Sequence, residues 1–553
     1  REISNAFGSY FSNIGKKLAD DIASRHIGTG SSPDMYNIKR VPANCFLYPT
    51  SQKEIERLIK NLKPKHSKGY DNVTNVILKG IYPSILYPLC LIFNKSLSTG
   101  QFPTNMKLAI VQPLYKGKSN LDICNYRPIS LLPVMSKILE KVVNNRLTKF
   151  FIKHNVLYEG QYGFRTNRGT EDAIMDFTGN ILNGFNNGMI TIGVFLDMSK
   201  AFDSIRHETL LKKLEIYGIR GVARNWLESY LLDREIQVKF KDVLSQKFSL
   251  PFGTPQGSVL GPLLYIVLAN DLNKCLKFCS SVSFADDTTI FVTGKNLRFL
   301  YRKINEDLSK LNKWFEDNSL SLNIDKSNYI LFRTKNKIID YNSQVRVGNK
   351  EIKQVKNIKF LGVIIDEYLD WSMHVKSILS KLSTGIYSIN MTKNMLPIFA
   401  KRLIYLSNFQ SHLNYALCIW GPMISAKWKN KLQVQQNKAI RSIYNLNKRT
   451  GLSSHYKKAK LMKLGDMIDF ALVNISYRYV NNVLPKRITN LFEVQTYHQT
   501  RNMNVLQTRI HTLQIYNKSF LGRAPHLWLH LSQNIKNSTT KTSFKKKFFS
   551  SRF

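Results

Sequence analysis

The stretch SVSFADDTTIFV, residues 281–292, places two aspartates next to each other in a segment that otherwise has the pattern of a β-strand. Val282 and Phe284 alternate with smaller polar residues, which is typical of a half-buried strand. Ionised carboxylates are rare within strands because burial removes their hydration. Asp286 and Asp287 therefore indicate a tight turn between two strands, where both side chains can reach the same edge of a sheet.

A third aspartate follows another strand-like segment. MITIGVFLDMSKAFDSI (189–205) predicts a buried strand from Ile190 to Leu196 that stops at Asp197. If this strand lies beside the hairpin, Asp197 and Asp286 converge and repel each other unless a divalent cation lies between them. Hard carboxylate oxygens suit Mg²⁺, and two such ions about 3.5–4 Å apart catalyse in-line phosphoryl transfer. Each aspartate taken alone is equally well explained as a turn or capping residue.

The charge of the chain points to a polyanionic partner. Its 553 residues suggest three or four domains at about 150 residues each, and 81 Lys and Arg residues against 37 Asp and Glu give a net charge of +44. Nucleic acid is the preferred partner, because the release of its counterions favours binding by a protein with many distributed cations. An anionic membrane surface is the competing interpretation.

Three further features limit the class of protein. Six scattered cysteines lack zinc-site spacing, so they predict free thiols. The longest uncharged stretch, 248–270, is interrupted by Gly and Pro, which favours a loop entering a buried helix over a membrane span. The chain begins at Arg1 and not at Met, so we expect a fragment of a longer product.

The motifs resemble those of reverse transcriptases from non-LTR (LINE-like, jockey-like) retrotransposons. The stretches FLDMSKAFDSI (195–205), GTPQGSVLGPLL (253–264) and FADD (284–287) are similar to motifs A, B and C of these enzymes. Upstream, 125–147 and 159–174 resemble the finger motifs, and downstream, 321–332 and 358–371 resemble motif D and the primer grip. The resemblance covers about residues 60–375, and 517–536 resembles the usual end of such reading frames.

The resemblance implies an α+β right-hand polymerase, with fingers, a ferredoxin-like palm carrying an antiparallel sheet, and a helical thumb. The expected domains are a helical N-terminal extension (1–102), fingers and palm (103–370), a helical thumb (371–462) and a basic C-terminal nucleic-acid-binding region (463–553). The end of that last region, KTSFKKKFFSSRF (541–553), mixes lysines with aromatic rings. This composition suits phosphate contact with base stacking, and a frayed cationic terminus is the alternative.

The function implied by the resemblance is RNA-directed DNA polymerisation, in which a primer 3′-OH is extended with dNTPs on an RNA template. Two Mg²⁺ ions, with Mn²⁺ as a substitute, would be the cofactors. Element RNA and target DNA would be the partners, in a ribonucleoprotein of the nucleus and cytoplasm without a membrane partner. The N-terminal endonuclease of such elements is expected to be missing from this fragment. An RNA-dependent RNA polymerase and a non-catalytic nucleic-acid-binding relic are the two alternatives.

The resemblance also implies roles for individual residues. The metal ligands and catalytic acids are Asp197, Asp286 and Asp287, and Lys326 is the candidate general acid for pyrophosphate departure. Residues implied to bind the incoming nucleotide are Lys116, Arg127, Phe202, Gln256 and Gly257. Residues implied to contact template or primer are Arg165, Arg168, Phe360, Leu361 and Gly362. Phe202 would exclude a ribose 2′-OH, and a core aromatic is its alternative role.

Overall fold

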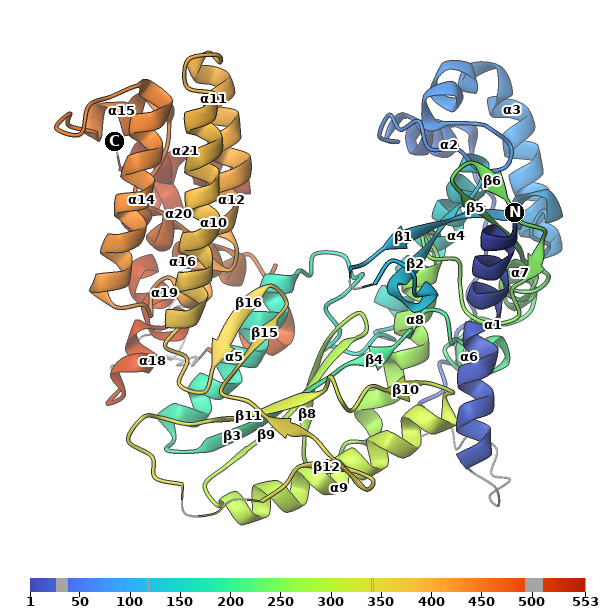
Figure 1. Ribbon diagram of the computed structural model, residues 1–553, viewed down its shortest axis with the longest axis horizontal. Helices are drawn as coiled ribbons and strands as arrows, with labels where there is room; N and C mark the ends of the chain where they lie inside the picture. The colour runs from blue at the N-terminus through green and yellow to red at the C-terminus, as the bar shows by residue number, and fades with distance from the viewer. Residues whose placement is uncertain (26–37, 118, 340, 342, 493–510, 553) are drawn as a thin grey trace.

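A five-stranded sheet lies between two groups of helices in the structure, a computed structural model that describes residues 1–25, 38–117, 119–339, 341, 343–492 and 511–552 (Figure 1). The strands of this central sheet have the order β14–β11–β3–β9–β8. Their bounds are β3 (Ile190–Leu196), β8 (Ser280–Phe284), β9 (Asp287–Gly294), β11 (Asn328–Phe332) and β14 (Lys353–Gln354). All neighbouring pairs are antiparallel except β11 and β14.

Strand β3 is the centre of this sheet, and all seven of its residues are buried. Successive side chains of a strand point to opposite faces. Ile192 and Val194 therefore share a hydrophobic core with helices α8 (Gly261–Leu268) and α9 (Leu297–Asp317). On the other face, the ring of Phe195 lies 5.5 Å from that of Phe177 in helix α5 (Thr170–Asn186). Cover on both faces explains why the side chains of the strand are apolar except for that of Thr191, which is hydrogen-bonded to Thr293.

The N-terminal lobe contains a second sheet. Its strands are β1 (Ala109–Tyr115), β2 (Tyr126–Leu131), β5 (Glu235–Phe240), β6 (Val243–Leu244) and β7 (Phe248–Ser249), in the order β2–β1–β5–β6 with β7 also paired to β5. Helix α1 (Glu2–Arg25) covers this sheet with Phe7, Phe11 and Ile14. The other helices of the lobe are α2 (Gln52–Lys60), α3 (Asn75–Thr99), α4 (Val134–Lys153), α6 (His207–Ile216) and α7 (Val222–Leu231), and its 3-10 turns are η1 (Thr104–Met106) and η2 (Ile123–Asn125).

Shorter elements connect these parts. Strand β4 (Met198–Ser199) pairs with β10 (Ser321–Leu322), β12 (Arg346–Val347) pairs with β13 (Lys350–Glu351), and β15 (Asn357–Phe360) pairs with β16 (Val363–Asp366). The 3-10 segment η3 (Ala269–Cys275) follows α8. The β15–β16 hairpin leads directly into the C-terminal lobe, so it lies at the base of the helices beside the central sheet (Figure 1).

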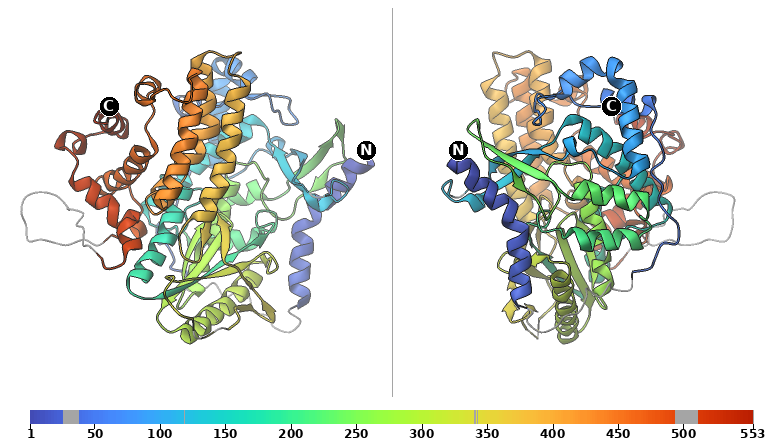
Figure 2. Two further views of the ribbon diagram at one scale, coloured as in Figure 1. Left: turned by 60° about the vertical axis from the view of Figure 1, so that its left-hand side comes forward. Right: turned by 90° about the vertical axis from the view of Figure 1, so that its right-hand side faces the viewer.

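The C-terminal lobe is helical. Its elements are α10 (Ser372–Met391), α11 (Ile398–Tyr405), the π-helical turn η4 (Leu406–Gln410), α12 (Ser411–Asn414), α13 (Leu417–Trp420), α14 (Ala426–Tyr444), α15 (Ser453–Ala459), α16 (Leu464–Val480), α17 (Lys486–Thr489), α18 (Gln514–Lys518), α19 (Phe520–Leu529), α20 (Gln533–Lys536) and α21 (Lys541–Ser550). Figure 2 shows the long helices α10 and α14 standing side by side. Helix α19, near the end of the chain, packs against α16. The lobe shares one hydrophobic core with α5 and one face of the central sheet.

The expected use of the chain's end for base stacking is wrong for Phe544 and Phe548, while Phe553 lies outside the described residues. Phe544 and Phe548 of α21 are fully buried, and the ring of Phe544 lies 4.4 Å from that of Tyr477. A frayed terminus is equally wrong for α21, since these two rings fix the helix to α16. Lys545 and Lys546 remain exposed. Lys545 and Lys546 are therefore available to phosphate, whereas Phe544 and Phe548 belong to the core.

The local predictions around the aspartates are confirmed. The buried strand spans Ile190–Leu196, and the pair of strands β8 and β9 turns at Ala285 and Asp286. The uncharged stretch 248–270 is a loop that enters the buried helix α8. All six cysteines are free thiols.

Helix α3 is long and apolar enough to cross a membrane, and no other helix of the described residues meets this criterion. It is weak evidence for a span, because length and composition alone also select core helices of soluble proteins. Leu78, Leu89 and Phe93 bury one face of α3 in the N-terminal lobe, where it packs against α2 and α7. Ile81 and Leu91 of the same helix are exposed.

Candidate active site

The hairpin between β8 and β9 places Asp286 at the end of the central sheet. Phe284 pairs with Asp287 across the ladder, so Ala285 and Asp286 are the two turn residues. Ala285 has a positive φ of 59°, as two-residue hairpin turns require. Leu196, the last residue of β3, pairs with Thr288. Asp197 therefore follows β3 at the same sheet end as the hairpin.

The three carboxylates influence one another electrostatically. Burial raises the pKa of Asp197, and the charge of Asp286 raises it further, while Lys326 acts in the opposite direction. Partial burial together with the charges of Asp286 and Asp197 raises the pKa of Asp287 to about 6. The nearest cation is the Lys326 ammonium, 3.9 Å from Asp197 Oδ2. A site of this kind gains stability from added positive charge.

The donor set fits a divalent metal ion. Across the described part of the chain, no group of three or more His, Cys, Asp or Glu side chains is arranged as a ready-made metal site. Mg²⁺ does not need one, because it binds through one or two carboxylates and completes its shell with water and substrate phosphates. Asp197 and Asp286 supply two carboxylates that line the same cavity. These two residues are therefore the ones that would hold the ion.

This cavity, of about 670 Å³, brings together residues that lie far apart in the sequence. Its wall contains eight of the predicted site residues: Lys116, Arg127, Asp197, Phe202, Gln256, Gly257, Asp286 and Lys326. Four cationic side chains, including Lys200, thus line the same cavity as three carboxylates, including Asp203, in a space of a size typical for small-molecule sites. Burial and the nearby charge of Arg127 lower the pKa of Lys116. An anionic ligand between these cations would relieve their repulsion.

Phe202 forms part of the apolar wall of the cavity. Its ring is half-buried, 4.7 Å from the ring of Tyr265 and 6.3 Å from that of Phe164. Tyr265 is fully buried and donates its hydroxyl hydrogen to the sulfur of Met198. The contacts on one side fix the ring, and its other side faces the cavity. Phe202 is thus both a packed aromatic and a cavity residue.

Gln256 and Gly257 are fixed by contacts that the sequence did not indicate. Gln256 Nε2 donates to both carboxylate oxygens of Asp203, at 2.7 and 2.8 Å, and its carbonyl accepts from Ser130 N at 2.8 Å. Gly257 has a φ of 117°, and a Cβ there would lie 2.8 Å from the Ser130 carbonyl oxygen. Only glycine fits this position. The loop before α8 is therefore held against β2.

A smaller cavity, of about 160 Å³, lies next to the first. It is lined by Asp197, Asp287, Lys326, Phe360 and Leu361, among other residues. Asp197 borders both cavities, whereas Asp286 lines the larger one and Asp287 the smaller one. The structure thus separates the two adjacent aspartates and brings the predicted primer residues next to Asp287.

The turn that carries Leu361 and Gly362 is held by the C-terminal lobe. Both residues have positive φ, 43° and 89°, in the tight turn between β15 and β16. Tyr415 donates its hydroxyl hydrogen to the Leu361 carbonyl and packs against Gly362. Phe360 is buried against Phe195. Tyr415 was missed in the sequence because it lies over fifty positions downstream, without a local motif.

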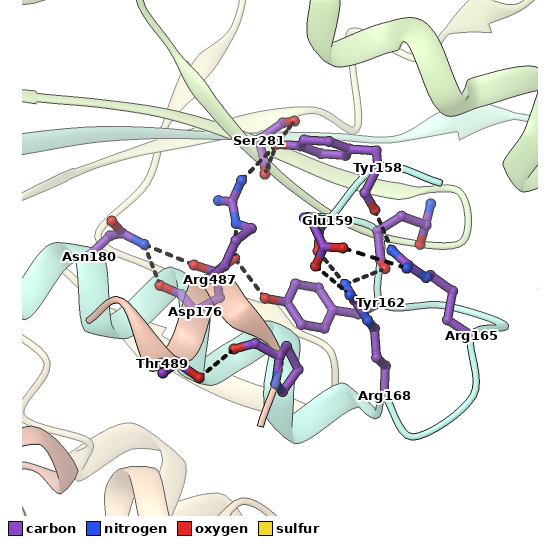
Figure 3. A network of polar contacts seen from close by, with 12 residues as sticks. Tyr158, Glu159, Tyr162, Arg165, Arg168, Asp176, Asn180, Ser281, Arg487 and Thr489 are labelled. Atoms are coloured by element: carbon purple, nitrogen blue, oxygen red, sulfur yellow. Dashed lines mark hydrogen bonds and ion pairs between the residues drawn. The ribbon is translucent and has the colours of Figure 1, made fainter. Parts of the chain in front are cut away.

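Arg165 and Arg168 are engaged within their own loop. Only 14% and 11% of their side chains are exposed. Arg165 Nη1 donates to the Tyr158 carbonyl at 2.6 Å, and Arg168 forms an ion pair with Glu159 (Figure 3). Neither residue lines either of the two cavities. These contacts give the two arginines a structural role, and contact with a template stays a prediction.

Two further residues of the site were missed in the sequence. Ile14 of α1 and Asn323 both line the larger cavity. The backbone N–H of Asn323 donates to the Asp197 carbonyl at 2.8 Å and so fixes the residue after β3. An isolated Ile in an amphipathic helix carries no functional signal in sequence. Its role follows only from the packing of α1 beside the second sheet.

Comparisons with known proteins find similar sequences in one family. Residues 116–365 match the family model described as reverse transcriptase (RNA-dependent DNA polymerase). The chain is similar to a probable RNA-directed DNA polymerase from transposon BS of Drosophila melanogaster, with 30% identity over 416 residues that make up 71% of this chain and 44% of that protein. It is also similar to the RNA-directed DNA polymerase from mobile element jockey of Drosophila melanogaster, with 28% identity over 455 residues, or 79% and 48% of the two chains. The chain spans less than half the length of these two relatives.

Proposed function

The chain contains a reverse transcriptase domain and belongs with the RNA-directed DNA polymerases of LINE-like mobile elements; from this premise we propose that it extends a DNA primer with dNTPs on an RNA template at the larger cavity. The observation that carries the proposal is the wall of that cavity, in which Asp197 and Asp286 face Lys116 and Arg127. A triphosphate is the ligand whose charge suits both the cations and a carboxylate-held metal ion.

The reaction transfers a nucleotidyl group. The primer 3′-oxygen attacks the α-phosphorus of the dNTP, the bond from that phosphorus to the bridging oxygen breaks, and pyrophosphate leaves. Divalent ions held by Asp197 and Asp286 would supply a lowered pKa of the attacking hydroxyl and neutralise charge on the phosphates. In this proposal Lys116 and Arg127 bind the triphosphate, and Lys326 gives a proton to the departing pyrophosphate.

The remaining residues orient the substrates in this proposal. Gln256 and Gly257 lie against the incoming nucleotide and the template base, where the missing Cβ lets the backbone approach. Phe360, Leu361 and Gly362 seat the primer end beside Asp287. In this assignment the N-terminal lobe provides the fingers, the central sheet the palm and the C-terminal lobe the thumb. The exposed lysines of the C-terminal lobe bind the phosphates of the nucleic acid.

The proposed partners rest on the resemblance of the motifs to those of LINE-like reverse transcriptases, on the relatives' names and on the charge. We propose that the RNA is the transcript of the element and that the DNA is a nicked chromosomal target, in a ribonucleoprotein of the nucleus and cytoplasm. A membrane is not part of the proposal. The apolar helix α3 packs against α2 and α7, and the excess of +44 suits a polyanion that contacts many cations at once.

The test is extension of oligo(dT) on poly(rA) by the purified chain with and without Mg²⁺. The proposal predicts synthesis that depends on the metal and on the RNA template. Incorporation of NTPs in preference to dNTPs would instead identify an RNA polymerase. Binding of the primer–template without any synthesis, with Mg²⁺ or Mn²⁺, would identify a non-catalytic relic.

Replacing Phe202 by Ala should admit ribonucleotides. The ring occupies the cavity wall where a 2′-OH would lie, so its removal should raise NTP incorporation relative to dNTP incorporation by roughly 10–100-fold, since an apolar wall discriminates a hydroxyl to about that extent. The measurement is the ratio of the two kcat/KM values. Phe164→Ala is the matched control, because it removes the neighbouring ring from the same wall. An unchanged ratio in Phe202→Ala would refute the assignment.

A further inference from the structure

The segment 158–163 lies alongside the strand that leads into the catalytic hairpin. Ser283 N donates to the Gly160 carbonyl at 2.9 Å, and Tyr162 N donates to the Ser283 carbonyl at 2.8 Å, which adds a short parallel bridge to the edge of β8. Gly163 approaches the turn so closely that a Cβ there would lie 2.2 Å from Ala285 N. The segment is thus fitted to the hairpin by its backbone.

The side chain of Gln161 holds the turn itself. Its Oε1 accepts hydrogen bonds from Ala285 N at 3.0 Å and from Gly163 N at 2.8 Å, and its Nε2 donates to the Ala285 carbonyl at 3.3 Å. Gln161 is 6% exposed, so these bonds are shielded from water. Both polar backbone groups of Ala285, the residue before Asp286, are therefore bound by one buried side chain.

Ala285 needs such support because of its conformation. It has a φ of 59°, and left-handed backbone is unfavourable for a residue with a Cβ. The orientation of this peptide sets the direction of Asp286, the next residue in the turn. Gln161 lines neither of the two cavities. It can act on the reaction only through the position of the hairpin.

We propose that Gln161 is a positioning residue that fixes the backbone of Ala285 and so directs the Asp286 carboxylate into the larger cavity. This inference rests on the proposed function. It assigns the orientation of Asp286 in part to a residue of the segment before α5. A hydrogen-bonding side chain that orients a metal-binding carboxylate affects both metal affinity and rate.

A second layer of side chains holds the segment in place. The Tyr162 hydroxyl donates to Asp176 Oδ2 at 2.9 Å, and the Tyr158 hydroxyl donates to the Ser281 carbonyl at 3.0 Å (Figure 3). These bonds lie at α5 and at the start of β8, and none of them reaches the turn. They stabilise the same segment without holding Ala285. Tyr162→Phe is therefore a matched control for Gln161→Met.

The experiment compares Gln161→Met and Tyr162→Phe in the full chain. Both variants remove buried hydrogen bonds of one segment, but Gln161→Met alone releases the turn. We expect Gln161→Met to lower the maximal rate of single-dNTP extension by roughly 10–100-fold, as for other residues that orient metal ligands. The KM for dNTP and the affinity for primer–template should stay close to wild type. Tyr162→Phe should keep the wild-type rate.

A second readout does not depend on synthesis. Binding of Mn²⁺ to the free chain, followed by its electron paramagnetic resonance signal, should weaken in Gln161→Met and not in Tyr162→Phe. A wild-type rate and Mn²⁺ affinity in Gln161→Met would overturn the inference, as would an equal loss in both variants. If the wild-type chain made no DNA, the proposed function would fail, and the Mn²⁺ comparison would still decide the role of Gln161.

Discussion

The Asp286→Asn variant is expected to lose DNA synthesis by roughly a thousandfold or more, because stabilisation of the transition-state charge by a bound metal is worth several kcal/mol. Asparagine keeps the size of the side chain and removes the charge that would hold the ion. Asp286 lines the larger cavity together with Asp197, and no other side chain of the hairpin does so. The measurement is single-nucleotide extension at saturating primer–template and Mg²⁺.

The same substitution should not destabilise the fold. Asp286 raises the pKa of both Asp197 and Asp287, which shows that the three carboxylates repel one another. Removing one charge relieves this repulsion, so the thermal unfolding midpoint should stay the same or rise. Nucleic-acid binding should likewise persist.

The control for Asp286→Asn is Asp242→Asn. Asp242 is an exposed turn residue between β5 and β6, and it lines neither cavity. This variant receives the same chemical change and should extend the primer at the wild-type rate. Synthesis by Asp286→Asn within tenfold of the wild type would refute the metal assignment, and a lowered unfolding midpoint would show that the carboxylate serves the fold.

The sequence was sufficient for the parts of the site that depend on local pattern. A run that is largely apolar predicts a buried strand, and β3 has the expected bounds, Ile190–Leu196. Two carboxylates between apolar segments predict a turn, because a strand interior excludes them. Asp197 and Asp286 could then be paired because strand ends on one side of a sheet lie together.

The contacts that orient these residues could not be predicted in the same way. Gln256 binds Asp203, and Gln161 binds Ala285, across more than fifty and more than one hundred positions. Neither pair has a periodic or compositional signal, since any buried glutamine needs some partner. Only the packing of segment 158–163 and of the loop before α8 selects those partners.

The C-terminal region shows a different limit. Its many lysines and arginines predict a surface for nucleic acid, and composition alone treats all of them as equivalent. Arg478 and Arg487 nevertheless form ion pairs with Asp172 and Asp176 of α5, at 2.8 and 2.7 Å. These two arginines join the C-terminal lobe to the helix that covers the central sheet. Neither pair could be predicted from the sequence, because its two residues lie about three hundred positions apart.

Deleting residues 464–553 would therefore change more than nucleic-acid binding. Leu491 and Phe520 pack over Gly179 in the middle of α5. Their removal would expose an apolar face of α5 and leave Asp172 and Asp176 without their cations. A weaker affinity in such a deletion could arise from the fold as easily as from lost phosphate contacts. A point substitution separates the two causes.

Arg487→Met is the substitution that tests this attachment. Arg487 Nε donates to Asp176 Oδ2 at 2.7 Å, and Nη1 donates to the Tyr158 hydroxyl at 2.8 Å, so the guanidinium links α17 to α5 and to the segment beside β8 (Figure 3). The side chain of Asp176 is 1% exposed. Methionine retains most of the apolar length of the arginine and leaves that carboxylate buried without a cation.

We expect Arg487→Met to weaken the attachment of the C-terminal lobe by about 3 kcal/mol, the lower end of the cost of breaking a buried ion pair. The lower end applies because Asp176 keeps its bonds from Tyr162 and Asn180. In hydrogen exchange, this corresponds to roughly hundredfold faster exchange of the protected α17 amides if they exchange through opening of the lobe. The exchange rates to be measured are those of the Ile488 and Thr489 amides, because both amides donate to the Pro485 carbonyl.

Lys486→Met is the matched control, since Lys486 is the adjacent, exposed cation of the same helix. It lowers the charge of the chain equally, so it should reduce nucleic-acid affinity as much as Arg487→Met does through long-range electrostatics, without faster amide exchange. Adding Asp176→Asn to Arg487→Met should cost less than the sum of the two single changes, because it removes the uncompensated charge. Equal exchange in Arg487→Met and Lys486→Met would mean that the Arg487–Asp176 ion pair does not hold the C-terminal lobe on α5.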